Sequence, residues 1–207
     1  VAADITHDET SGVQSADGAD DTAAALPGAF SGIVGTLIGS AVVASGGSVT
    51  GAAAYGADGA GNTVTNSFTL TTSAGATFSA TATNLQATNS NAIFLYSEGG
   101  LVVGRVGTAG GVADAAGAVA FALNVGGTGT VTLAQYLAID HGDGSGAEVA
   151  PLGANELINL LNAAGTTELI YVTANVTVTD GAGDTVTSDL ISGSALTVSF
   201  LDDGPGL

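Results

Sequence analysis

Two glycine-rich loops carry the residues whose types and spacing could do chemistry. Asp180 and Asp184 stand four residues apart around two glycines, and Asp58 lies in an earlier loop. That earlier loop, Ala57–Thr65, matches Thr179–Thr187 at seven of nine positions. Oxygen ligands on a flexible loop suit a hard cation, and calcium is the one expected. The loops therefore predict Ca²⁺ binding by Asp58, Asp180 and Asp184.

A second pair of carboxylates, Asp202 and Asp203, follows one strand later. If Thr185–Leu201 forms a hairpin, its ends return close together. Asp180 and Asp184 then meet Asp202 and Asp203 at one pole. Four such charges would be costly to bring together without a cation. An ordinary turn remains an open interpretation for both loops, and most of all for the loop at Asp58, because Asp-Gly pairs favour hairpins.

The charge balance excludes several classes of partner. The 207 residues include 19 acidic side chains, one arginine (Arg105) and no lysine, for a net charge of -18. Nothing could neutralise the phosphates of nucleic acid or of an anionic membrane. Divalent cations would relieve the repulsion, although adaptation to high salt is an alternative explanation. The chain has no cysteine, so bound metal is the expected substitute for disulfides.

The uncharged stretch Leu26–Ala57 raises the question of a membrane span. Glycines and serines interrupt it throughout, so it is too polar for a spanning helix, and no membrane insertion is expected. The chain starts at Val1 without methionine or a visible signal peptide. We therefore expect a segment of a longer protein.

Short apolar runs between glycine, serine and asparagine predict an all-β fold. Several runs alternate with period two, as half-buried antiparallel strands do. We expect an antiparallel β-sandwich of the immunoglobulin-like or Greek-key type. The expected strands are Gly32–Ile38, Val64–Thr71, Ala76–Ala82, Ala92–Tyr96, Leu101–Val106, Val119–Val125, Thr130–Leu133, Leu169–Val178, Thr185–Leu190 and Ala195–Leu201.

One or two short helices complete the expected domain. Asn155–Leu161 has apolar residues at helical spacing between two glycines, and Leu133–Ala138 is a weaker case. Residues 1–25 are polar and acidic, which favours a linker leading into the domain. We therefore divide the chain into an acidic segment, 1–25, and a single β-sandwich domain, 26–207.

A set of short motifs occurs in a defined order along the chain. It opens with Asp8-Glu9-Thr10 and closes with Asp202-Asp203-Gly204-Pro205. The motifs between are Tyr55-Gly56-Ala57-Asp58-Gly59, Val102-Val103-Gly104-Arg105, Val119-Ala120-Phe121-Ala122-Leu123, Tyr136-Leu137-Ala138-Ile139-Asp140-His141 and Val178-Thr179-Asp180. Over nearly its whole length the chain resembles the DUF5801 or T1SS-143-type repeat domain of giant repeats-in-toxin (RTX) adhesins exported by type I secretion.

The resemblance implies a calcium-stiffened extender repeat of a secreted adhesin on the bacterial cell surface. Such a stalk serves cell adhesion and biofilm formation, projects a distal binding module, and is not an enzyme. Its partners would be calcium and the neighbouring repeats of the same chain, and an isolated unit would be monomeric. The resemblance places Asp8 and Glu9 at the pole where the chain enters. It places Asp180, Asp184, Asp202 and Asp203 at the opposite pole, with Ala182 replacing one usual aspartate.

Other sites fit the sequence less well. His141, in Asp140-His141-Gly142-Asp143, superficially suggests zinc, but no further ligands have the right spacing, so we expect a solvated loop or a secondary calcium site. Paired carboxylates could hydrolyse glycosides, yet the chain has no tryptophan to stack against a sugar.

The alternative function is a glycan- or surface-recognition module, with Tyr55 and Tyr96 as its modest candidates. For Arg105 we expect a structural role, either beside a nearby carboxylate or with its stem covering apolar surface.

Overall fold

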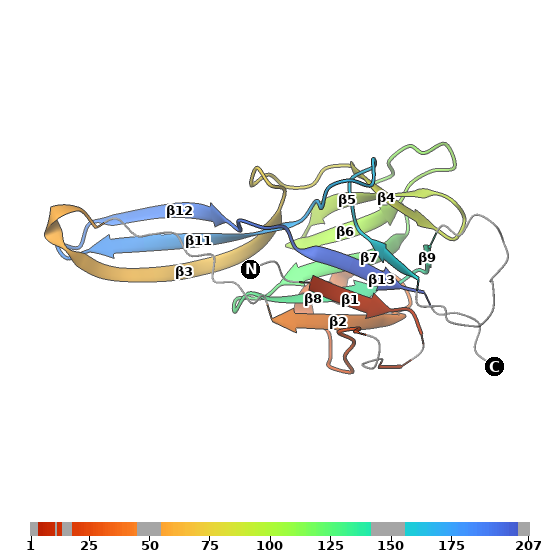
Figure 1. Cartoon of the computed structure of the whole chain (residues 1–207), viewed down its shortest axis with the longest axis horizontal. Coiled ribbons are helices and arrows are strands. Elements are labelled where there is room, and N and C mark those ends of the chain that lie inside the picture. The colour runs from red at the N-terminus through yellow and green to blue at the C-terminus, as the bar shows by residue number, and fades with distance from the viewer. Residues whose placement is uncertain (1–3, 11, 14–17, 45–54, 142–155, 203–207) are drawn as a thin grey trace.

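The fold is all-β, and it is seen in a computed structural model that describes residues 4–10, 12–13, 18–44, 55–141 and 156–202. In these ranges the only helices are two short 3₁₀ helices, η1 and η2. The predicted antiparallel β-sandwich is confirmed. Its strands form three sheets, two in the body of the molecule and one that projects from it (Figure 1).

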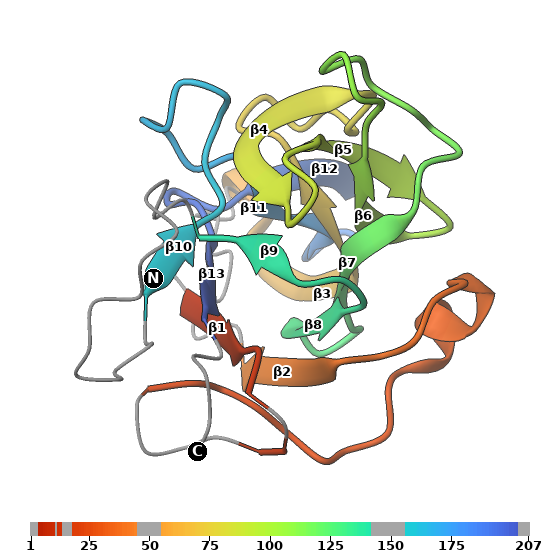
Figure 2. The same cartoon turned by 90° about the vertical axis from the view of Figure 1, so that its right-hand side faces the viewer.

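The largest sheet has seven antiparallel strands and curls around the core, as the end view shows (Figure 2). Its strands, in spatial order, are β2 (Gly39–Ala44), β8 (Thr130–Gln135), β7 (Val119–Val125), β6 (Leu101–Val106), β5 (Ala92–Glu98), β4 (Thr81–Ala87) and β9 (Ile139–Asp140). The expected runs at 101–106 and 119–125 coincide with β6 and β7. These central strands are buried on both faces, so their sequence is apolar except at the half-buried Arg105 and Asn124.

A three-stranded sheet packs against the open side of the curled sheet. It contains β1 (Asp4–Asp8), β13 (Thr197–Leu201) and β10 (Leu157–Asn159), with β1 parallel and β10 antiparallel to β13. The core lies between the two sheets, where the rings of Phe121 and Phe200 are 5.2 Å apart. This packing of side chains from both layers defines the sandwich.

The outer face of the large sheet is covered by the segment that contains η1 (Gly28–Gly32). Phe30 of this segment is buried with Val103, Ala134 and Tyr136 in a second, smaller cluster. The predicted strand Gly32–Ile38 is wrong, because this stretch ends η1 and then crosses the sheet surface as coil.

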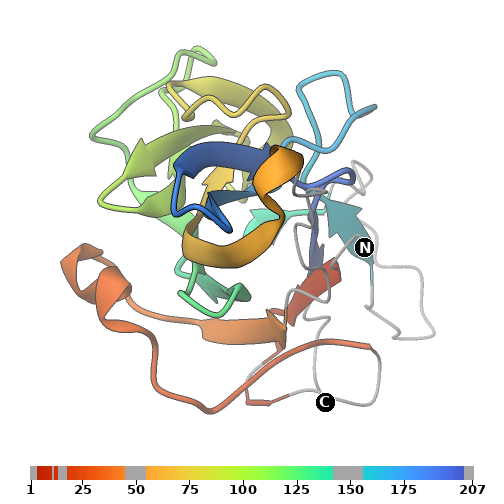
Figure 3. The same cartoon turned by 90° about the vertical axis from the view of Figure 1, so that its left-hand side faces the viewer.

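The third sheet, which we call the arm, projects away from the body (Figure 1), and Figure 3 looks along it from its tip. It consists of β3 (Ala60–Thr71), β11 (Tyr171–Asp180) and β12 (Thr185–Ile191), with β11 in the centre. Leu70 and Val172 at the root of the arm belong to the main core, whereas β3 and β12 are exposed towards the tip. The arm therefore starts in the core and ends in solvent.

Both predicted helices are wrong. Leu157–Asn159 is strand β10, in which Ile158 pairs with Phe200, and Leu161 forms an isolated bridge with Glu168; Asn155 lies outside the described residues. Leu133–Gln135 belongs to β8. Pairing with neighbouring strands satisfies the backbone and buries the apolar residues, and this outweighs a short helical pattern.

The acidic N-terminal segment is part of the fold rather than only a linker. Residues 4–8 form β1, and Ile5 is completely buried. Asp20 and Asp21 accept hydrogen bonds from the backbone amides of Thr6 and Asp8, at 3.1 and 3.2 Å. These carboxylates serve as acceptors along the free edge of β1, which explains their presence in a folded region.

Within the described part of the chain, no helix is long and apolar enough to cross a bilayer.

Candidate metal sites at the two ends of the molecule

The two related loops meet at the tip of the arm. The backbone amide of Gly181, in the turn between β11 and β12, donates to the carbonyl of Gly59, which follows η2 (Gly56–Asp58), at 3.1 Å. A Cβ atom on Gly181 would overlap the carbonyl oxygen of Asp58, so the two loops need glycine to approach this closely. The repeated sequence thus builds two halves of one tip.

Asp58, Asp180 and Asp184 all lie at this tip. Asp180 Oδ1 accepts hydrogen bonds from the backbone amides of Ala182 and Asp184, at 3.0 and 2.9 Å. That geometry is an Asx turn, so the carboxylate already stabilises the hairpin. The carboxylate oxygens at the tip are ligands of the kind that calcium prefers. The Asx turn supports the alternative interpretation, in which the loop is an ordinary turn.

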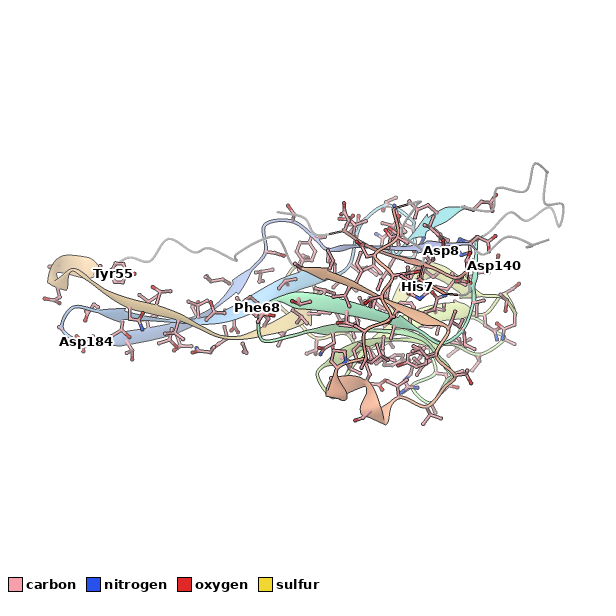
Figure 4. All side chains as sticks on the ribbon, turned by 90° about the horizontal axis from the view of Figure 1, so that it is seen from below. His7, Asp8, Tyr55, Phe68, Asp140 and Asp184 are labelled. Atoms are coloured by element: carbon pink, nitrogen blue, oxygen red, sulfur yellow. The ribbon has the colours of Figure 1, made fainter. Side chains whose placement is uncertain are left out.

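The hairpin expected over Thr185–Leu201 does not form. β12 pairs with β11, whereas β13 pairs with β1 and β10 in a different sheet. Figure 4 shows Asp184 at the arm tip and Asp8, the pairing partner of Leu201, at the far side of the body. The predicted meeting of Asp184 with Asp202 is therefore wrong; Asp203 lies outside the described residues.

Asp8, Glu9 and Asp202 come together at the end of the body opposite the arm. Because β1 and β13 are parallel, Asp8 pairs with Leu201, and the amide of Glu9 donates to the carbonyl of Leu201 at 3.0 Å. The resemblance implied that Asp8 and Glu9 lie at one pole and Asp202 at the other. The structure places them at the same end of a single unit.

Glu9 is buried among polar groups at this end. Its Oε1 accepts hydrogen bonds from the amide of Ile139, at 2.9 Å, and from Nε2 of Gln135. Gln135 Nε2 also donates to the carbonyl of Leu137 at 3.0 Å. His141 Nε2 lies 3.7 Å from the same Glu9 oxygen. We call Glu9, Gln135, His141 and Asp202 the end cluster.

The expectation of a solvated loop at His141 is wrong. Its side chain is 4% exposed, and neither ring nitrogen has a hydrogen-bond partner. Burial lowers the pKa of His141, but the carboxylate of Glu9, the charge of Asp202 and the carbonyl of Glu156 raise it by more, so the pKa lies above its ordinary value. Sequence spacing could not reveal this contact, because Glu9 and His141 are far apart in the chain.

His7 and Gln135 are buried polar residues that the sequence did not single out. His7 lies under Gly39, where an added Cβ would come within 2.5 Å of Nε2, and its Nδ1 is 4.0 Å from Asp21 Oδ1. The sequence did hold a signal for the burial of His7: it stands two residues after the apolar Ile5, and residues two apart on a strand share a face.

Arg105 has the structural role expected of it. Its guanidinium donates to both carboxylate oxygens of Glu98, at 2.7 and 2.6 Å, and to the carbonyl of Gly117 at 2.7 Å. These hydrogen bonds hold the pKa of Glu98 below its ordinary value. Arg105 is the only arginine in a chain without lysine, and it is thus engaged by Glu98 and Gly117, away from both ends.

Among the described residues, neither end holds a preformed metal centre of three or more side chains. In the ranges that the structure describes, no three His, Cys, Asp or Glu side chains are placed to bind one ion. The arm tip has oxygen donors only, whereas the end cluster adds an imidazole. The two ends therefore differ in donor chemistry, although both are acidic.

The molecule is thus an all-β sandwich with a projecting three-stranded arm and carboxylates at both ends. The chain belongs to the family described as Domain of unknown function (DUF5801), whose sequence profile matches residues 4–190. Neither the curated proteins nor the solved structures gave a match to it.

Proposed function

We propose that this chain is a calcium-stiffened extender repeat of a secreted bacterial surface adhesin. The parallel pairing of β1 and β13 supports this most. Because parallel strands run in one direction, the chain enters this sheet on the arm side and leaves it at the opposite end (Figure 1). A rod of successive domains requires that arrangement, since each domain must pass the chain on at its far end.

The distribution of charge supports a role for calcium in this stalk. The net charge is -18, and the single arginine is engaged by Glu98. Asp8, Glu9 and Asp202 gather at one end. Divalent cations would relieve repulsion there and fix the angle to the neighbouring repeat. The proposed role is structural, with calcium and neighbouring repeats as partners.

Melting curves in EDTA and in millimolar calcium test this proposal on the single chain and on a tandem of two copies. Extracellular calcium sites bind at about 10⁻⁴–10⁻³ M. A site of about 100 μM would add about 2.7 kcal/mol at about 10 mM calcium. For this size that shifts Tm by roughly 5–11 °C. We expect most of the rise in the single chain, because Asp8, Glu9 and Asp202 share one unit.

Two variants identify the end that binds. Asp202→Asn should remove the calcium-dependent rise if the ion binds at the far end of the body, and Asp184→Asn if it binds at the arm tip. A melting temperature that calcium leaves unchanged in both single and tandem chains would refute calcium stiffening. Binding on a glycan array would favour the recognition module instead; Tyr55 and Tyr96, its candidates, are half-buried.

A further inference from the structure

His141 is a buried base with no hydrogen-bond partner. Both ring nitrogens are shielded from solvent and make no hydrogen bond, and Nε2 has only the 3.7 Å contact with Glu9 Oε1. Leaving one buried polar group unpaired costs about 1–3 kcal/mol. An unpartnered group of this kind requires an explanation, and an ion that is bound there is one.

The groups around the ring are metal ligands by type. The Glu9 carboxylate, the Asp202 carboxylate and the backbone carbonyl of Glu156 all act on the imidazole. They come from three separate parts of the chain, and of these Glu9 contacts the ring most directly, at 3.7 Å from Nε2. Calcium sites use oxygen ligands, whereas mixed nitrogen and oxygen sets suit zinc and other divalent transition metals.

The separation of His141 and Glu9 fits two ligands of one ion. At 3.7 Å, Nε2 and Oε1 are too far apart for a hydrogen bond, which spans about 2.7–3.2 Å. Two ligands bound to zinc at about 2.0–2.2 Å lie roughly 3.4–3.7 Å apart when the angle between them is roughly 110–120°. The separation of these two atoms is therefore that of two ligands of one ion.

Hydrogen bonds also hold the Glu9 carboxylate in place. The amide of Ile139 and Nε2 of Gln135 both donate to its Oε1, and Gln135 is itself fixed by the carbonyl of Leu137. Hydrogen bonds to a ligand orient it, and their loss weakens metal binding. Gln135 is completely buried, so this orientation is rigid.

We propose that His141 and Glu9 bind a divalent transition-metal ion such as Zn²⁺, with Asp202 moving in as the third ligand. His141 would bind through Nε2, and water would complete the coordination. The inference goes beyond the proposed calcium role and does not depend on it, because these contacts lie within one unit whether or not that unit is part of a stalk.

Histidine side-chain ¹⁵N NMR of the whole chain, with equimolar Zn²⁺ or with Ca²⁺, tests this directly. The chain has only two histidines, so His7 is an internal control. We expect zinc to shift Nε2 of His141 to the range of a metal-bound nitrogen, to saturate at one ion per chain, and to leave His7 unchanged. Calcium should not produce that shift.

Variants supply the matched controls. His141→Gln should abolish the one-to-one zinc binding, and Gln135→Leu should weaken it about 10–100-fold. Asp184→Asn, at the arm tip, should leave zinc affinity unchanged.

Three results would overturn the inference: no zinc effect at His141, equal effects at both histidines, or a charged imidazolium at His141 that zinc does not alter. The last would assign the contact with Glu9 to an ion pair. A calcium-dependent rise in Tm without a zinc shift would overturn this inference alone, and the reverse would refute calcium stiffening alone.

Discussion

Phe121 shows how single residues fix the distance between neighbouring strands. Its ring is completely buried and lies against Phe200 at an interplanar angle of 50°. Gly104 is the cross-strand partner of Phe121, and the ring occupies the space that a side chain would fill. An added Cβ at Gly104 would lie 2.5 Å from the ring. The glycine therefore makes room for one of the largest fully buried side chains of the core.

Gly104→Ala should destabilise the domain by about 1–3 kcal/mol, because the ring cannot move without disturbing the opposite sheet. Urea unfolding measures the change, and Gly127→Ala is the matched control, since a Cβ there meets no atom within 4 Å. We expect the control to be neutral or slightly stabilising. Equal effects of the two substitutions would refute this account of the core.

The sequence predicted some residue roles but not others. A structural role for Arg105 was predicted, with pairing to a nearby carboxylate as one of two alternatives, and the structure shows that pairing with Glu98. The burial of Glu9 and His141 was not, since it depends on β1 and the stretch after β9 meeting across the fold. Polar residues are usually read as exposed, so buried polar contacts are the ones that sequence patterns miss.

Along the outer half of the arm, the contacts between side chains are mainly polar. Asn66 donates to Asn175 at 2.9 Å and to Thr177 at 2.8 Å, and Thr177 and Thr187 lie 2.7 Å apart. These side chains are exposed, so each contact contributes little. The backbone ladder and the tip contact must therefore hold the strands together.

Hydrogen exchange should show the arm opening from its tip while the body stays protected. Gly181→Ala should speed exchange in residues 176–187, because the new methyl group cannot fit against the Asp58 carbonyl. It should change the protection of β6 and β7 little. Ala182→Ser, in the same turn, is the control. A Gly181→Ala variant that loosens the body as much as the arm would contradict this division.

The sequence predicted whole elements best where strands are central. The limits of β6 and β7 follow directly from apolar runs bounded by glycines or polar residues. The misread helix at 155–161 is a peripheral element, whose form depends on β13 lying beside it. A short pattern with i, i+3 and i+4 spacing cannot reveal such a neighbour.

At the scale of the whole molecule, β1 contributes to the closed core. Ile5 is completely buried in the main core cluster, beneath a segment rich in aspartate. Ile5→Ala should therefore cost about 2–5 kcal/mol in urea unfolding. Val13→Ala is the control, because Val13 is 51% exposed and should change stability by less than about 0.5 kcal/mol. If both substitutions lowered the free energy of unfolding equally, the N-terminal segment would be a linker rather than part of the core.

Alternating apolar residues predicted the all-β class of the molecule, but not its division into body and arm. The arm pairs Ala60–Thr71 with Tyr171–Asp180, strands more than a hundred residues apart in sequence. Nothing local specifies which strands pair over such separations. The loop repeat at Asp58 and Asp180 was the only signal in the sequence, because the two matching loops lie together at the tip.

The parallel pairing of β1 with β13 also determines how the molecule would respond to tension. Traction on the chain before Asp4 and after Leu201 pulls the two strands along their axes in opposite directions. Such a load is shear, in which the hydrogen bonds between the strands resist together rather than breaking one after another. β1 and β13 are thus also the strands that resist the applied force, while the arm lies outside the line of force.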